Sequence, residues 1–193
     1  MALWGITDAD ESKPKWLTTA QKKEVFANNS GWVVEAGSTQ TGNDNTDAQP
    51  EVLCCVGDLA TGIGAADITE IEFITTAFDK SDGGNIDVRV RFNEQVTVNT
   101  SGGTPTLTIT NDTPSRNLTA TYLSGSTTNE LIFRKTIAAD NAATNAGDVL
   151  SIGANPLALA SGTIKDTADG TTNATITSVA SIGAAAGTIT VAA

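Results

Sequence analysis

The segment NIDVRVRFNE, residues 85–94, alternates apolar and polar side chains without a break. In an extended chain successive side chains point to opposite faces, so one face of this segment is apolar and the other is polar and charged. A period of two is typical of a β-strand with one buried side. The segment therefore predicts a strand whose buried face is made by Ile86, Val88, Val90 and Phe92.

Similar patterns return several times in the second part of the chain. TPTLTIT, LTATYL and ELIFRKTI alternate in a related way, and DVLSIG, SGTIKD and NATITSV are further runs of strand length. Turn-forming clusters such as SDGGN and SGGTP separate these runs. Six to eight short strands at this spacing predict an antiparallel β-sandwich. A parallel α/β fold would need helices between the strands, and only AADNAATNA offers a candidate.

A change in composition divides the chain into two predicted domains, residues 1–65 and 66–193. All three tryptophans precede residue 33, whereas Thr, Ala, Gly and Asn dominate the later part. The boundary is predicted near GDLATGIGAADIT, because a stretch of small residues buries little surface and is typical of a linker. The chain is therefore expected to be mainly β, with a small N-terminal docking module followed by the sandwich.

The N-terminal module has weaker local signals. TTAQKKEVFANN predicts a short helix with Thr18 or Thr19 as its N-cap. GWVVEAG and EVLCCVG predict two paired strands, and the polar segment between them predicts an exposed loop. Cys54 and Cys55 are adjacent, which disfavours a disulfide between them, so they are interpreted as small buried side chains of a strand.

Charge and composition argue against several classes of function. The net charge of −11 would repel nucleic acids and anionic membrane surfaces, so neither is expected as a partner. The chain contains no histidine, which removes the commonest general base and most zinc sites. We therefore predict a non-enzymatic protein with no catalytic, cofactor-binding or metal-ligating residues.

Two acidic segments contain candidate ligands for a calcium ion. Asp79, Asp82 and Asp87, and the segment DTADG at 166–170, offer oxygen ligands of the kind that calcium prefers. Their spacing does not match an EF-hand loop, so they are interpreted as solvated turn residues. A carbohydrate hydrolase would need a pair of carboxylates set in a cleft, and no feature of the sequence favours such a pair.

Residues 68–180 resemble the bacterial immunoglobulin-like repeat found in large surface and adhesion proteins. The resemblance is carried, in order, by VRVRFNEQVTV, GGTPTLTIT, ATYLSGSTTNELIFRKTIAAD and LASGTIKDTADG. TADGTTN replaces the AAGN usual in the repeat, which is a small departure within a loop. The resemblance implies an Ig-like β-sandwich that is a structural and interaction module without catalytic residues.

Residues 1–65 resemble the start of small virion structural proteins of T4-like phages that infect marine cyanobacteria. MALWG, KPKWL and GWV carry this resemblance. It implies a virion protein, assembled in the host cytoplasm, whose partners are the major capsid protein or other virion subunits and which forms a homo-oligomer on the particle. The N-terminus also lacks the basic and apolar segments of a signal peptide, which fits cytoplasmic assembly.

The resemblance assigns a docking role to Leu3, Trp4, Trp16, Leu17 and Trp32. Together with Phe26, these side chains are expected to form a small aromatic core whose edges contact neighbouring virion subunits, because tryptophan is enriched at interfaces. The alternative is that the tryptophans only fill the core of the module itself.

The expected function is that of a capsid decoration or stabilising protein with a projecting Ig-like domain. A neck, tail or fibre-attachment protein of the virion is the second expectation, and a bacterial surface-adhesion module is the third. A host-surface glycan is a further candidate ligand for the tip of the Ig-like domain.

Overall fold

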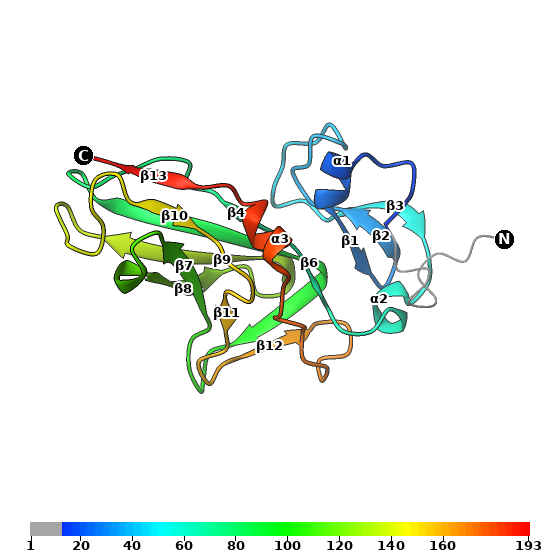
Figure 1. The fold of residues 1–193 in the computed structure, drawn as a ribbon. Helices are drawn as coiled ribbons and strands as arrows, with labels where there is room; N and C mark the ends of the chain where they lie inside the picture. Colours follow the sequence, from blue (N-terminus) through cyan, green and yellow to red (C-terminus); the bar gives the residue numbers. More distant parts are fainter. Residues whose placement is uncertain (1–12) are drawn as a thin grey trace.

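The computed structural model describes residues 13–193 and shows a mainly β fold (Figure 1). We call residues 13–65 the N-terminal unit and residues 66–193 the sandwich unit. Figure 1 shows the N-terminal unit at one end of the sandwich unit, away from the end at which the C-terminus lies. Within the described residues, no helix has the length and apolar composition needed to cross a membrane.

The N-terminal unit is a small three-stranded sheet flanked by two short helices. Its elements are α1 (Thr19–Lys23), β1 (Val25–Asn28), β2 (Gly31–Val34), β3 (Glu51–Cys55) and α2 (Leu59–Gly62). β2 pairs antiparallel with both β1 and β3, so β3 forms the edge of the sheet. The unit has its own apolar core, made by Leu17, Val25, Ala27, Trp32, Val34, Leu59 and Ile63.

The first part of the sandwich unit is organised around one long strand. β6 (Gly84–Asn99) pairs antiparallel with β4 (Ile68–Phe73) on one side and with β9 (Thr128–Ile137) on the other. The sheet continues through β8 (Leu118–Ser124) to β7 (Thr106–Asn111). β12 (Thr163–Asp166) pairs with the end of β6, and β11 (Leu157–Ala158) pairs with β7.

The second part of the sandwich unit extends from β7. β10 (Val149–Ser151) pairs with β7, β13 (Ile189–Ala192) pairs with β10, and β5 (Phe78–Asp79) pairs with β13. Helix α3 (Ala180–Ala184) precedes β13, and a 3₁₀ turn, η1 (Pro114–Arg116), joins β7 to β8. Apolar side chains of both parts share one core, which is the arrangement expected of a β-sandwich.

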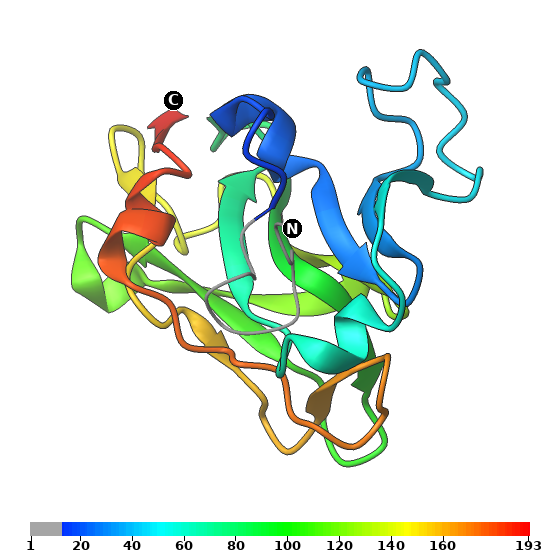
Figure 2. The same ribbon diagram turned by 90° about the vertical axis from the view of Figure 1, so that its right-hand side faces the viewer.

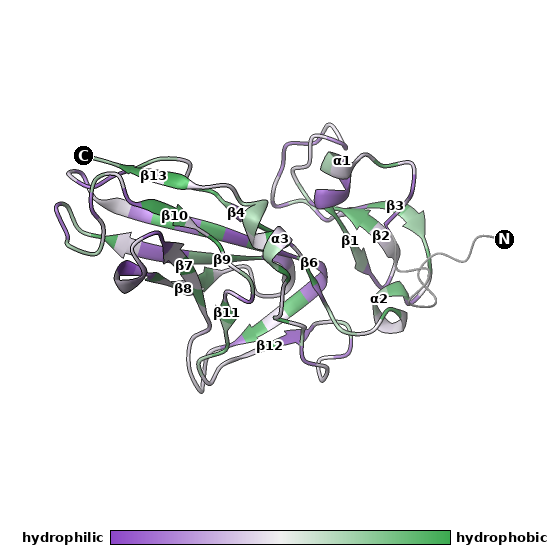
Figure 3. Ribbon diagram, in the orientation of Figure 1, coloured by the Kyte–Doolittle hydropathy of each residue, from purple (hydrophilic) through white to green (hydrophobic). Residues whose placement is uncertain are grey.

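The alternating segment behaves as its pattern predicts. Ile86, Val88, Val90 and Phe92 are all completely buried in the core of the sandwich unit. Bands of alternating hydropathy are visible along β6 in Figure 3. The equivalent apolar positions of the strands β7 and β9 are buried as well, so the prediction of a half-buried sheet is confirmed. Two pairs, β1–β6 and β5–β13, are parallel, and the sheet is therefore mixed rather than purely antiparallel.

Helix α1 is shorter than its sequence pattern predicts. Thr18 is the N-cap, and it forms a reciprocal capping box with Gln21, but the helix ends at Lys23. Residues 25–28 form β1 instead, with Val25 and Phe26 opposite Val34 and Val33 of β2. The strand is favoured because Val25, Phe26 and Ala27 are buried and because it pairs with β2 on one edge and, through Ala27, with β6 on the other.

The predicted linker over residues 57–69 is wrong in part. The segment contains α2, and Leu59, Ala60 and Ile63 are buried, so it closes the N-terminal core. The predicted burial of the cysteines is also wrong, since Cys54 is half-buried and Cys55 is exposed on the edge strand β3. The loop between β2 and β3 is largely exposed, as its polar composition predicts.

The structure of the last third of the chain differs from its pattern in three places. AADNAATNA forms turns rather than a helix, and NATITSV forms only isolated bridges, at Asn173 and Thr175. α3 and β13 have no clear signal in the sequence. β13 is nevertheless held by β10 and β5, which supply partners on both of its edges.

We expect Phe92→Ala to lower the free energy of unfolding by about 3–5 kcal/mol, because it removes a large side chain from a closed core. Leu123→Ala is the matched control: Leu123 is exposed, and its truncation should cost less than about 1 kcal/mol. Urea unfolding of the two variants measures the difference. Equal losses would show that the core is not centred on β6.

Candidate functional site

The predicted docking residues occupy different environments. Trp16 is 60% exposed on the surface of the N-terminal unit. Leu17 and Trp32 are buried in the core of that unit, so in this structure they stabilise the unit and offer no surface to a partner. For these two residues the structure replaces the predicted interface role with a core role. Leu3 and Trp4 lie outside the described residues.

The aspartates considered as calcium ligands do not converge. Asp87 lies on β6 and is bound by Arg134, whose Nη2 atom is 2.6 Å from its Oδ2 atom. Asp79 accepts a hydrogen bond from the hydroxyl of Ser81, and this contact lowers the pKa of Asp79. Among residues 13–193, no group of three or more Asp, Glu or Cys side chains is arranged to hold a metal ion.

A group of charged side chains in mutual contact lies where the two units meet. Arg91 stands on the polar face of β6 and is only 6% exposed, because the N-terminal unit covers it. Its Nε atom is 2.6 Å from Glu130 and 3.3 Å from Glu35, and its Nη1 atom is 2.8 Å from Glu70 and 3.1 Å from Glu72. We call this set, with Arg89 and Lys23, the Arg91 cluster.

The Arg91 cluster joins the units more than backbone pairing does. β1 and β6 share a single parallel bridge, between Ala27 and Glu94. By contrast, Glu35 of the N-terminal unit reaches both Arg91 and the side-chain amide of Asn129, at 2.7 Å. Lys23 of α1 forms an ion pair with Glu70 of β4. Charged side chains therefore hold the N-terminal unit against the sandwich unit.

The electrostatics of the cluster follow from its burial. Burial, together with the neighbouring charge of Glu130, raises the pKa of Glu35 to about 7, although Arg91 opposes this shift. Burial acts in the same direction on Glu70, but hydrogen bonds from Lys23 and Arg91 outweigh it and lower the pKa of Glu70. Burial disfavours the Arg91 cation, yet Glu35 and Glu130 keep its pKa above the usual value.

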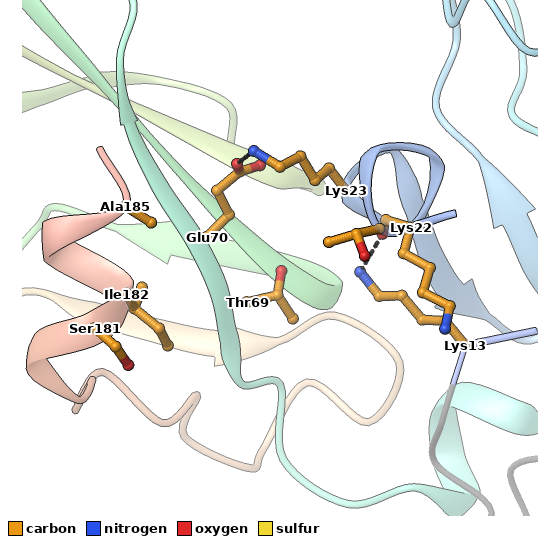
Figure 4. Close-up of a pocket in the computed structure, with 9 residues that line it drawn as sticks. Lys13, Lys22, Lys23, Thr69, Glu70, Ser181, Ile182 and Ala185 are labelled. Atoms are coloured by element: carbon orange, nitrogen blue, oxygen red, sulfur yellow. Dashed lines mark hydrogen bonds and ion pairs between the residues drawn. The ribbon is translucent and has the colours of Figure 1, made fainter. Parts of the chain in front are cut away.

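A pocket of about 350 Å³ opens beside the cluster, between α1, β4 and α3 (Figure 4). Its walls include Lys13, Lys22 and Lys23 from the N-terminal unit, Thr69 and Glu70 from β4, and Ile182 and Ala185 from the α3 segment. The Lys13 ammonium donates a hydrogen bond of 2.7 Å to the carbonyl oxygen of Lys22. Burial lowers the pKa of Lys13 to about 8.

A second buried acidic pair lies at the other end of the junction. Glu94 of β6 and Asp166 of β12 are completely or almost completely buried, and their side chains share a hydrogen bond. Burial raises the pKa of Asp166.

The sequence pattern predicts part of the Arg91 cluster. Arg89 and Arg91 on β6, and Glu70 and Glu72 on β4, occupy alternate positions of two strands, which places each pair on one face. Opposite charges on neighbouring strands are a known source of stabilisation. The pattern does not indicate that another part of the chain covers that face, so it does not predict the cluster as a whole.

No protein-family model, no curated protein sequence and no solved structure matches the chain.

We expect Arg91→Met to lower the free energy of unfolding by about 3–5 kcal/mol, because four carboxylates around it lose their shared cation. Arg134→Met is the matched control, since Arg134 pairs with a single aspartate at a more exposed site. Its loss should be about 1 kcal/mol or less. Similar losses in urea unfolding would argue against a structural role for the cluster.

The raised pKa of Glu35 predicts a pH dependence of stability. The pKa of this carboxyl is about 7 in the folded protein and 4.5 in the unfolded chain. Its contribution to the free energy of unfolding is therefore complete below pH 4.5 and is lost as the pH rises to 7. We expect wild-type protein to lose about 2–3 kcal/mol from this group across that window. Glu35→Gln should flatten the loss, as measured by urea unfolding at several pH values. Parallel pH profiles for the two proteins would contradict the assignment.

Proposed function

We propose that this chain is a non-enzymatic structural protein of a phage virion, in which the N-terminal unit docks on the particle and the sandwich unit projects from it. The observation that carries the proposal is the exposure of Trp16 on the N-terminal unit. The preferred place is the capsid surface, where the protein would decorate or stabilise the shell. The resemblance of residues 1–65 to cyanophage virion proteins supports the same assignment.

Trp16 has the features of an interface anchor. The backbone N–H of Leu17 donates to the carbonyl oxygen of Pro14 at 3.2 Å, which closes a turn around Trp16. Leu17 is buried in the core and ties the turn to the body of the unit. An exposed indole held by a fixed backbone loses little conformational freedom on binding, and tryptophan is among the commonest residues at interface hot spots.

The division of the molecule supports separate docking and projecting roles. Each unit has its own apolar core, and the N-terminal unit lies at one end of the sandwich unit (Figures 1 and 2). A partner that binds the N-terminal unit therefore leaves the opposite end of the sandwich unit accessible. The partner we propose is the major capsid protein or another virion subunit, with several copies of this chain on each particle.

A bacterial surface-adhesion module is the second candidate function, and the Ig-like motifs of the sandwich unit favour it. A neck, tail or fibre-attachment position in the virion is a variant of the first candidate. The two functions differ in where the binding surface lies. The virion function uses the Trp16 face of the N-terminal unit, whereas the adhesion function uses the loops of the sandwich unit, with a host glycan as ligand.

Binding to particles that lack the protein tests the virion function. We expect Trp16→Ala in the full chain to weaken co-sedimentation by roughly tenfold or more, because truncation of a buried interface tryptophan often costs about 2 kcal/mol. Multivalent attachment can mask a single change, so the double variant Trp4→Ala, Trp16→Ala is tested in parallel.

Val179→Ala is the matched control for this experiment. Val179 is an exposed apolar residue of the sandwich unit, with 64% of its surface accessible. It should leave particle binding unchanged. Loss of binding in Val179→Ala with retention in the tryptophan variants would place the contact with the particle on the sandwich unit and contradict the docking role of the N-terminal unit.

A further inference from the structure

The pocket between α1, β4 and α3 has a charge that contrasts with the rest of the molecule. The chain carries 22 acidic and 11 basic residues, and three of the 11 basic residues line this pocket. Such a concentration of cations in one hollow of an acidic protein attracts anions to that place.

Lys13 is the central cation of the pocket. Figure 4 shows its ammonium group under α1, on the side that faces β4. The ammonium donates to the Lys22 carbonyl oxygen, and within residues 13–193 no carboxylate lies within 4 Å of it. A lysine ammonium has three donors, so two remain for another acceptor. At neutral pH the group is largely protonated, because its pKa is about 8.

Glu70 does not neutralise this cation. Among the described residues that line the pocket, Glu70 is the one that carries a carboxylate. Both of its oxygens already bind other side chains of the protein. One oxygen is bound by Lys23, and the other lies 2.8 Å from Nη1 of Arg91. Lys22 also lines the pocket, and it forms no ion pair within the described part of the chain. Lys13 and Lys22 are therefore available to a negative group from outside.

The opposite wall of the pocket is apolar. Ile182 and Ala185 of the α3 segment face the lysines across the hollow, and the hydroxyl group of Thr69 lies between the two sides (Figure 4). A volume of about 350 Å³ lies within the range of sites that hold small organic molecules.

We propose that this pocket binds a small organic anion, with its carboxylate or phosphate group on Lys13 and Lys22 and its apolar part against Ile182 and Ala185. The lysine ammonium is a compact charge that can bind either a carboxylate or a phosphate, whereas the planar guanidinium of arginine favours two-pronged contacts. The bound molecule would touch both units, since Lys13 and Lys22 belong to the N-terminal unit and Ile182 belongs to the sandwich unit. It would therefore stabilise their association.

Titration with butyrate, butyl phosphate, inorganic phosphate and butanol tests this inference, with NMR chemical shifts of the full chain as the readout. We expect both organic anions to shift the signals of Lys13, Thr69 and Ile182. Inorganic phosphate should bind more weakly than butyl phosphate, because it lacks the apolar part, and butanol should bind least. A preference for one head group would identify the ligand as a phosphate ester or as a carboxylic acid.

Variants identify the cations involved. Lys13→Met and Lys22→Met should each weaken binding of butyl phosphate by about tenfold, the effect of losing roughly 1.4 kcal/mol of interaction. Lys165→Met is the matched control, since Lys165 lies on β12 and does not line the pocket. It should leave the affinity unchanged.

The wild-type protein supplies a test that needs no variant. Burial lowers the pKa of Lys13 to about 8, and the charges of Glu35, Glu70, Arg91 and Lys22 also act on it. Binding should therefore weaken by roughly tenfold between pH 7 and pH 9, as Lys13 loses its proton. Shifts located elsewhere in the molecule, equal binding of butanol, or an affinity independent of both lysines and of pH would overturn the inference. None of these results depends on whether the chain is a virion protein.

Discussion

The ion pairs around Arg91 are the contact on which the arrangement of the two units depends. Arg91 is buried beneath the N-terminal unit, and it is surrounded by carboxylates from β4, from β9 and from Glu35, which directly follows β2. A buried charge is stable only when its partners are held in place, because its removal from water is costly. The position of the N-terminal unit is therefore coupled to the geometry of the sheet beneath it.

β6 connects this contact to the core. One face of the strand carries Val90 and Phe92 into the apolar centre of the sandwich unit, and the other carries Arg89 and Arg91 toward the carboxylates. A change in the register of β6 would move the apolar residues out of the core and the arginines into it at the same time. The same pattern of alternation thus specifies both the fold and the junction.

The two proposed surfaces belong to different parts of the structure. Trp16 is an exposed aromatic side chain on a turn of the N-terminal unit, and it suits attachment to a large partner. The lysine-lined pocket lies between the units, and it suits a small anion. A ligand in the pocket would stabilise the position of the N-terminal unit, and in that way the two surfaces are linked through the Arg91 cluster.

The sequence by itself determined the half-buried strands of the sandwich unit and limited the N-cap of α1 to Thr18 or Thr19, because both depend on residues that are close along the chain. It also identified the part of the apolar core that β6, β7 and β9 contribute, since alternation places those side chains on one face. Only the tertiary structure decided that Arg91 and Trp32 are buried and that Leu59–Gly62 forms the helix α2. Arg91 and Glu35 are separated by 56 residues. Whether a charged side chain faces water or a buried partner depends on packing between segments that are distant in sequence, and local pattern contains no measure of that contact.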